Sequence, residues 1–253
     1  MLKIVWITDL HMRSPGDPAA AAMRERLDRV LAHAFARHAD AALCVITGDI
    51  AHTGEAGQYE AFGDAIRACP VPWRVLPGNH DDRARLAATA NLPLCGPAQT
   101  LRGATDLGGY RLLFIDTQLT GEDAGMVRPA DLEWLREELA GTPDPALLFM
   151  HHQPGRVFIP SSDTIGLVDG AAFEDVLARH RDRIAHIFFG HCHLPVSGSV
   201  GGIACTGLPA TAVQQTANFA DLAFIADDGA PPCYGVILAD GANLACHTIP
   251  VRL

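Results

Sequence analysis

Residues 184–193 read IAHIFFGHCH, an apolar run that ends in a glycine and in two histidines around one cysteine. A short run rich in branched and aromatic residues predicts a buried strand. A buried strand by itself gives no reason for His191 and His193 to follow it. Either the two histidines are polar residues that cap the strand, or they converge with other groups on a ligand.

The same pattern, an apolar run followed by polar residues, recurs along the chain. Buried strands are predicted at 2–8, 42–47, 73–77, 110–117, 146–152 and 184–189, and helices at 18–38, 55–68, 82–90, from 129 onward and at 170–180. After residue 190, glycines separate shorter strands near 195–206, 233–239 and 244–251. This alternation predicts an α/β fold of mixed sheets with helices outside them. With no linker or repeat, we expect one domain over residues 1–253, with C-terminal strands after about 205.

Composition limits the class of protein. The 253 residues are 49% hydrophobic, enough for one sizeable core. The apolar runs are too short for a membrane span or a signal peptide, so we expect a cytoplasmic protein without a membrane partner. A net charge of −10 argues against a nucleic-acid polymer but not against a small phosphorylated substrate, since bound metals reverse the sign locally. The 7 cysteines form no CxxC pair, which favours buried free thiols in a reducing compartment.

Polar side chains gather at the carboxyl ends of five predicted strands, where open α/β sheets form their ligand crevices. They are Asp9 and His11, Asp49, the Asn79–His80–Asp81 run, the His151–His152 pair, and His191 with His193. Each group alone has an ordinary reading as a helix cap, a turn residue or a hydrogen-bonded core histidine. Five such groups at the same end of successive strands predict a shared metal site.

The donor types indicate which metals suit this site. In extended backbone, residues i and i+2 point to one side, so we expect His191 and His193 to face together and Cys192 to face away. Carboxylates, imidazoles and one amide suit manganese, iron or zinc. Seven groups are too many for one tetrahedral ion, and two ions that share a bridging carboxylate would use them well.

With these motifs in order, the sequence resembles the calcineurin-like metallophosphoesterase superfamily. Its signature of D-x-H, G-D, G-N-H-[DE], H and G-H-x-H is present as DLH, GD, GNHD, HH and GHCH, over residues 9 to 193. PGNHDD, RLLFIDT and FMHHQP are most similar to the class III cyclic nucleotide phosphodiesterases and bacterial glycerophosphodiesterases. The resemblance implies a four-layer α/β/β/α sandwich and a centre of two metal ions, of iron, manganese or zinc.

The resemblance also implies a role for each residue. One ion would take Asp9, His11 and His193, the other Asn79, His151 and His191, and Asp49 would bridge them. Hydroxide held by the ions would attack the phosphorus, with His80 as the acid beside the leaving group and with Asn79, His80 and His193 as substrate contacts. His151 is assigned by motif position, which leaves His152 open as ligand, acid or substrate contact. Asp81 either orients His80 or caps the next helix.

One departure from the superfamily bears on the substrate. The protein phosphatases carry G-D-x-V-D-R-G at the second motif, whereas this chain reads GDIAHTGE and places His52 where their second aspartate stands. Fewer fixed cations suit a monoanionic diester, since each unpaired charge carries a desolvation cost. Arg13 and Arg83 lie nearby in sequence, and we expect both on the surface. We expect residues 153–170 to border the site.

The sequence therefore predicts hydrolysis of a small phosphodiester, with a 3',5'-cyclic nucleotide ahead of a glycerophosphodiester. A phosphomonoesterase of the same superfamily is the second alternative. A binding scaffold without catalysis is more remote, because all seven ligands and His80 are retained. The glycine- and alanine-rich C-terminal part either adds strands or contacts a second subunit in a homo-oligomer.

Overall fold

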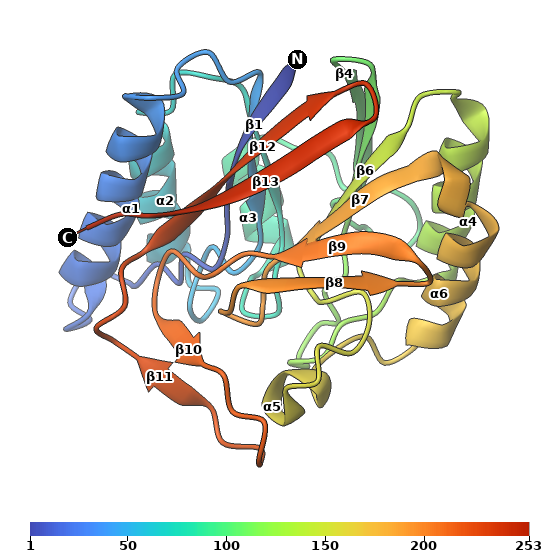
Figure 1. The fold of residues 1–253 in the computed structure, drawn as a ribbon. Helices are drawn as coiled ribbons and strands as arrows, with labels where there is room; N and C mark the ends of the chain where they lie inside the picture. The colour runs from blue at the N-terminus through green and yellow to red at the C-terminus, as the bar shows by residue number, and fades with distance from the viewer. Residues whose placement is uncertain (253) are drawn as a thin grey trace.

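Two β-sheets pack face to face, and helices cover the outer face of each, in a computed structural model that describes residues 1–252 (Figure 1). The first sheet has the strand order β13-β12-β1-β2-β3, and the second has the order β4-β5-β6-β7-β9-β8. The predicted four-layer α/β/β/α sandwich is confirmed.

The first sheet is built from the N-terminal βα units and closed by the C-terminal strands. Its elements are β1 (Leu2–Ile7), α1 (Ala20–Phe35), β2 (Leu43–Thr47), α2 (Ala56–Ile66), β3 (Trp73–Leu76), α3 (Arg83–Ala90), β12 (Cys233–Asp240) and β13 (Asn243–Pro250). β1 runs parallel to β2, and β2 runs parallel to β3, whereas β12 pairs antiparallel with both β1 and β13. The C-terminal strands therefore join the sheet that the chain begins with.

The second sheet uses the middle of the chain. Its elements are β4 (Gly103–Leu107), β5 (Tyr110–Ile115), α4 (Pro129–Gly141), β6 (Ala146–Met150), α6 (Gly170–Arg179), β7 (Ile184–Phe189), β8 (Val196–Val200) and β9 (Ile203–Gly207). The predicted strand near 195–206 is two strands, because a turn at Gly201 and Gly202, both at positive φ, folds β8 back on β9. Five short elements were not predicted from the sequence: β4, α5 (Pro160–Asp163), the 3₁₀ turn η1 (Arg181–Arg183), and the two strands of a hairpin, β10 (Gln214–Thr216) and β11 (Ile225–Asp227).

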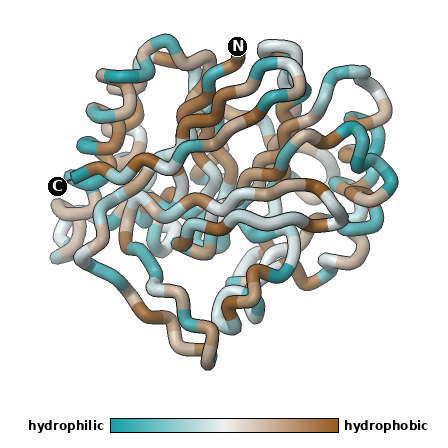
Figure 2. The backbone as a smooth tube through the Cα atoms, viewed as in Figure 1, coloured by the Kyte–Doolittle hydropathy of each residue, from teal (hydrophilic) through white to brown (hydrophobic). Residues whose placement is uncertain are grey.

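Alternating side chains along the strands fill the space between the two sheets. In β1, Leu2, Ile4 and Trp6 face the second sheet, while Val5 and Ile7 face the helices. Three phenylalanines of β5, β6 and β7, namely Phe114, Phe149 and Phe188, stack in a row with ring centroids 5.6 and 5.1 Å apart. The hydrophobic segments accordingly run through the strands at the centre of the molecule (Figure 2).

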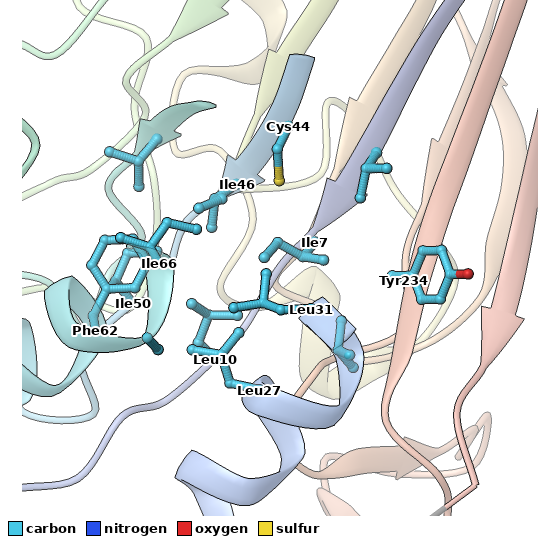
Figure 3. Close-up of a cluster of buried hydrophobic side chains, with 14 of the residues drawn as sticks. Ile7, Leu10, Leu27, Leu31, Cys44, Ile46, Ile50, Phe62, Ile66 and Tyr234 are labelled. Atoms are coloured by element: carbon cyan, nitrogen blue, oxygen red, sulfur yellow. The ribbon is translucent and has the colours of Figure 1, made fainter. Parts of the chain in front are cut away.

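A second hydrophobic layer joins the first sheet to its helices. Ile7 and Ile46 of the sheet pack with Leu27 and Leu31 of α1, and with Phe62 of α2 (Figure 3). α4 and α6 cover the second sheet in the same way through Leu135 and Phe173. No helix within residues 1–252 is long and apolar enough to cross a membrane.

Strand direction brings the polar residues together. β1, β2 and β3 are parallel in one sheet and β5, β6, β7 and β9 in the other, so the carboxyl ends of each set share one edge. The loops that follow these ends join across the sheets, because Ala212 N–H donates to the Asp9 carbonyl and Thr211 N–H to the Thr8 carbonyl. The candidate site lies in these loops.

The stacked phenylalanines predict a large contribution to stability. Phe149 is fully buried between the sheets, so Phe149→Ala should lower the free energy of unfolding by about 3–5 kcal/mol in urea titrations. Phe219, which is 71% exposed, serves as the matched control, and Phe219→Ala should change it by less than about 0.5 kcal/mol. Equal losses in the two variants would contradict the packing described here.

Candidate metal centre

The backbone is strained at most of the predicted ligands. Five of the eight non-glycine residues with positive φ in the described part of the chain are predicted ligands, and their φ angles lie between 45° and 66°. They are Asp9, His11, Asp49, His191 and His193. For a residue other than glycine, this left-handed backbone conformation costs about 1–3 kcal/mol, and residues that adopt it cluster at functional sites. The surrounding loops must therefore hold each of these residues in place.

Hydrogen bonds within the loops supply that support. Asp9 N–H donates to the Gly48 carbonyl at 3.0 Å, and His11 N–H donates to the Asp49 carbonyl at 2.9 Å. His191 N–H donates to the Asp9 carboxylate, and Cys192 N–H donates to the Gly190 carbonyl at 2.7 Å. The last bond closes a γ-turn around His191. The expected extended backbone at 191–193 is therefore wrong.

Three side chains from both sheets form the first half of the site with Asp49. His193 Nε2 lies 3.5 Å from Asp9 Oδ1 and 3.1 Å from His11 Nε2. His11 Nε2 lies 3.4 Å from Asp49 Oδ2. One ligand atom from each of these four side chains lies within 4.8 Å of the corresponding atoms of the other three. This is the set that the superfamily resemblance implies for one ion.

The second half gathers on the amide oxygen of Asn79. His151 Nε2 lies 3.1 Å from Asn79 Oδ1, and His191 Nδ1 lies 3.0 Å from the same oxygen. Asp49 Oδ1 is 3.5 Å from His151 Nε2, whereas Asp49 Oδ2 faces His11. The carboxylate thus presents one oxygen to each half, the arrangement that a bridging ligand needs.

The donor chemistry fits a cation in each half. A backbone carbonyl only accepts, so His151 Nδ1–H donates to the Thr47 carbonyl at 2.7 Å and His191 Nε2–H donates to the Ile165 carbonyl at 3.1 Å. In neutral rings the other two nitrogens then hold lone pairs, and both face the Asn79 oxygen, which is also an acceptor. Three acceptors that converge without a donor are satisfied by a metal ion. His193 repeats the pattern, since its Nδ1–H donates to the Val213 carbonyl at 2.6 Å.

The pKa shifts at the site also indicate that positive charge is needed beside the buried carboxylates. Burial alone would raise the pKa of Asp49, but His151 and His11 outweigh it and hold that pKa well below its usual range. Burial opposes charge on His151, yet Asp49 and Asp9 raise its pKa to about 9. His11 differs, because burial lowers its pKa to about 3. Without ions, protons on His151 therefore balance buried carboxylates, and metal binding would displace such protons.

The residues next to the proposed ligands have distinct partners. His152 is fully buried, and its Nε2–H donates to the Asp123 carbonyl at 3.1 Å while Nδ1 accepts from Thr117 Oγ1 at 2.8 Å. Both ring nitrogens of His152 thus have partners within the protein, one of them in the loop that carries Asp123. The role of His152 stays open, because its ring also lies with those of His151 and His191 in a group that can hold a metal ion. His80 Nδ1–H donates to the His52 carbonyl at 2.7 Å, which leaves Nε2 as its second ring nitrogen.

Neither role expected for Asp81 is correct. Its carboxylate accepts from the N–H groups of Ile50, Ala51 and Gly78 and from Tyr59 Oη, at 2.9 to 3.1 Å. These bonds tie the loop after β2 to the loop after β3. The helix cap is the next residue, because the Asp82 side chain accepts from Arg85 N–H at 3.0 Å.

A cavity of about 400 Å³ opens over both halves of the site. It is lined by His11, Arg13, Met23, Asp49, His52, Asn79, His80, Asp123, Ile165, His191, His193, Ala212, Val213 and Phe224. Ile165 belongs to the 153–170 segment, which therefore borders the site. A second depression of about 550 Å³, between α2 and α3, contains none of the predicted ligands.

The expected surface positions of two arginines are wrong. Arg13 is half-buried in the cavity wall, where its Nη1 lies 3.3 Å from Asp17 Oδ2. Arg83 is mostly buried and forms a two-bond ion pair with Asp116, at 2.7 and 3.1 Å. Arg13 follows the first motif closely in sequence, a signal that could have placed it at the site. No sequence signal indicates Phe224, which arrives on the β10–β11 hairpin.

Cys192 lies outside both halves although its neighbours belong to them. Its side chain is buried in the core beneath α4 and α6, with Sγ 3.6 Å from Gln153 Oε1. Burial raises the pKa of its thiol. All seven cysteines are free, four of them buried and three half-buried.

Residues 2–195 match the family model described as calcineurin-like phosphoesterase. The chain belongs to this family. The expectation of a metal-dependent phosphoesterase is thereby confirmed, and the Asp and His groups described above can hold divalent metal ions.

Two relatives and one solved structure illustrate the family. The chain is 30% identical to a probable cyclic nucleotide phosphodiesterase of Synechococcus, over 84% of this chain and 82% of the relative. It is also 30% identical to a glycerophosphodiester phosphodiesterase of Enterobacter lignolyticus, over 75% of this chain and 69% of the relative. The structure of a purple acid phosphatase from yellow lupin superposes with a TM-score of 0.71 at 13% identity, over 99% of this chain and 51% of that chain, and so shares the fold.

The shared carboxylate gives a direct test of the site. Asp49→Ala should lower the bound metal to one ion or none, since each half loses one of its oxygens, and elemental analysis of the purified variant measures this. Cys192→Ser is the control and should keep the metal content of the wild type, because Sγ faces the core. Two tightly held ions in Asp49→Ala would contradict the bridging assignment.

Proposed function

We propose that this protein is a phosphodiesterase with two metal ions, and that it hydrolyses a small phosphodiester, first of all a 3',5'-cyclic nucleotide. The observation that carries the proposal is the carboxylate of Asp49, which faces His11 with one oxygen and His151 with the other. Asp9, His11 and His193 would hold one ion, and Asn79, His151 and His191 the other. Iron, manganese and zinc all suit this set of donors.

Two bound ions supply Lewis acidity, which makes water a stronger acid and neutralises charge on phosphate oxygens. The protein's own residues supply position. The amide of Asn79 is oriented by its Nδ2, which lies 3.5 Å from Asp123 Oδ1, so that Oδ1 faces the centre. His80, Asn79 and His193 line the cavity and would contact the bound diester.

His80 is the proposed general acid. It lines the cavity, and its Nδ1–H is fixed on the His52 carbonyl, so the ring presents Nε2 to the leaving oxygen. A proton on Nε2 would pass to that oxygen as the phosphorus–oxygen bond breaks, and the ring would return to its neutral form. Histidine is suited to this transfer, because it changes charge near neutral pH.

The charges around the cavity favour a diester over a monoester. Arg13 is the one arginine among the residues that line the cavity, and Asp17 partly balances it. A diester carries a single negative charge, whereas a dianionic monoester needs a stronger cationic grip. Two relatives named as cyclic nucleotide phosphodiesterases, at 30% and 29% identity, support the cyclic nucleotide as first choice.

A glycerophosphodiester is the second candidate. It is favoured by the 30% identity to the glycerophosphodiester phosphodiesterase of Enterobacter lignolyticus. The cytoplasmic location expected from the sequence stays a prediction, as does the single domain.

A substrate panel tests the proposed class. With manganese-loaded enzyme, kcat/KM should be higher for bis(4-nitrophenyl) phosphate than for 4-nitrophenyl phosphate, because the second negative charge of the monoester meets no further arginine in the cavity lining. Cyclic AMP and glycerophosphocholine in the same assay separate the two diester candidates. A clear preference for the monoester would make the protein a phosphatase instead.

The role of His80 has its own test. His80→Ala should slow hydrolysis of a natural diester by about 10²–10⁴-fold, since an alkoxide leaves poorly without a proton. The variant should lose much less on bis(4-nitrophenyl) phosphate, whose leaving group is already stable, with the metal content unchanged. Equal losses on the two substrates would mean that His80 positions the phosphate instead.

A further inference from the structure

His52 contacts both His11, a proposed metal ligand, and His80, the proposed general acid. It follows β2 and lines the cavity beside Arg13. Its backbone N–H is held twice, by the Met12 carbonyl and by Gln58 Oε1, both at 3.0 Å. The same Gln58 oxygen accepts from Thr53 N–H at 2.9 Å. The segment that carries His52 is therefore fixed on both sides.

The side chain of His52 meets a proposed metal ligand. Its Nδ1 lies 3.3 Å from Nδ1 of His11, and one of the two nitrogens must donate. His11 Nε2 faces Asp49 Oδ2 and His193 Nε2, so a neutral His11 that binds an ion there keeps its lone pair on Nε2 and its proton on Nδ1. His52 Nδ1 is then the acceptor, and His52 carries its own proton on Nε2.

The backbone of His52 meets the proposed acid. Its carbonyl accepts from His80 Nδ1–H, and the two rings stack with centroids 5.3 Å apart at an interplanar angle of 22°. The side chain and the main chain of one residue thus serve different partners. The side-chain contact can be removed without changing the main-chain contact.

We propose that His52 is a positioning residue for the metal centre, which fixes the tautomer and the ring orientation of His11 through its Nδ1. The proposal rests on the two-ion function above and goes beyond it. Partners of this kind, which accept the remaining N–H of a metal-binding histidine, typically change metal affinity or activity by about 10–100-fold. The effect falls on the half of the site that contains Asp9, His11 and His193.

Two substitutions separate the acceptor from the ring. His52→Phe removes both nitrogens, keeps a flat ring against His80 and leaves the carbonyl in place. His52→Asn places an amide oxygen near the former Nδ1, where it accepts from His11. Manganese titration of metal-free protein by calorimetry should show one of the two ions bound about 10–100-fold more weakly in His52→Phe, and most of that affinity restored in His52→Asn.

Controls distinguish this role from general damage. His33 lies on α1, is not among the residues that line the cavity and contacts Tyr234 instead, so His33→Phe should bind both ions as the wild type does. In His52→Phe, the ratio of kcat for cyclic AMP to kcat for bis(4-nitrophenyl) phosphate should stay at the wild-type value, because the backbone carbonyl of residue 52 still accepts from His80.

Two results would overturn the role of His52. One is unchanged metal binding in His52→Phe. The other is a His52→Asn variant that binds as weakly as His52→Phe, which would assign the effect to the imidazole ring itself. A wild type that binds fewer than two ions is a separate outcome, which would contradict the proposed two-ion function.

Discussion

The burial of two carboxylates at the ends of β1 and β2 is the constraint on which this site depends. Asp9 is fully buried and Asp49 is 2% exposed, and an isolated buried charge is too costly to keep. Each carboxylate is therefore surrounded by imidazoles, and Asp49 also accepts from His80 N–H at 3.0 Å. Imidazoles and metal-binding groups have to lie close to the carboxylates of Asp9 and Asp49. The positive φ angles at the site and the glycines packed against these side chains are consistent with that requirement.

Glycines make the required close approach geometrically feasible. A side chain at position 78 would overlap the carboxylate of Asp49, and one at position 190 would overlap Thr8 and approach Asp9. At position 48, φ is +99° and an added side chain would overlap the ring of His151. Gly48, Gly78 and Gly190 are therefore part of the site, although each reads in the sequence as an ordinary turn glycine.

The sequence predicted the fold and which polar residues the structure brings together, but not the backbone conformations of those residues. Strand and helix positions follow from apolar periodicity, because the buried faces of both sheets are long and regular. The γ-turn at His191 could not be predicted, since its positive φ is set by partners such as Asp9, which lies far away in the chain. The position of Arg13 in the cavity wall could not be predicted for a related reason, because the loops packed over an arginine decide whether it faces solvent or a cavity. The β10–β11 hairpin carries no motif, so nothing in the sequence indicated that Phe224 borders the cavity.

Each half of the site draws its side chains from both sheets. Asp9 and His11 follow β1 while His193 comes from beyond β7, and Asn79 follows β3 while His151 and His191 follow β6 and β7. Ions bound as proposed would act as two cross-links between the first sheet and the second sheet. Ligands that bind only the folded state add RT ln(1 + [L]/Kd) to its stability, about 2.7 kcal/mol at a hundred times Kd. With the ions bound in this way, the packing of the two sheets and the supply of metal would be thermodynamically linked, so that a chelator would also lower the stability of the fold.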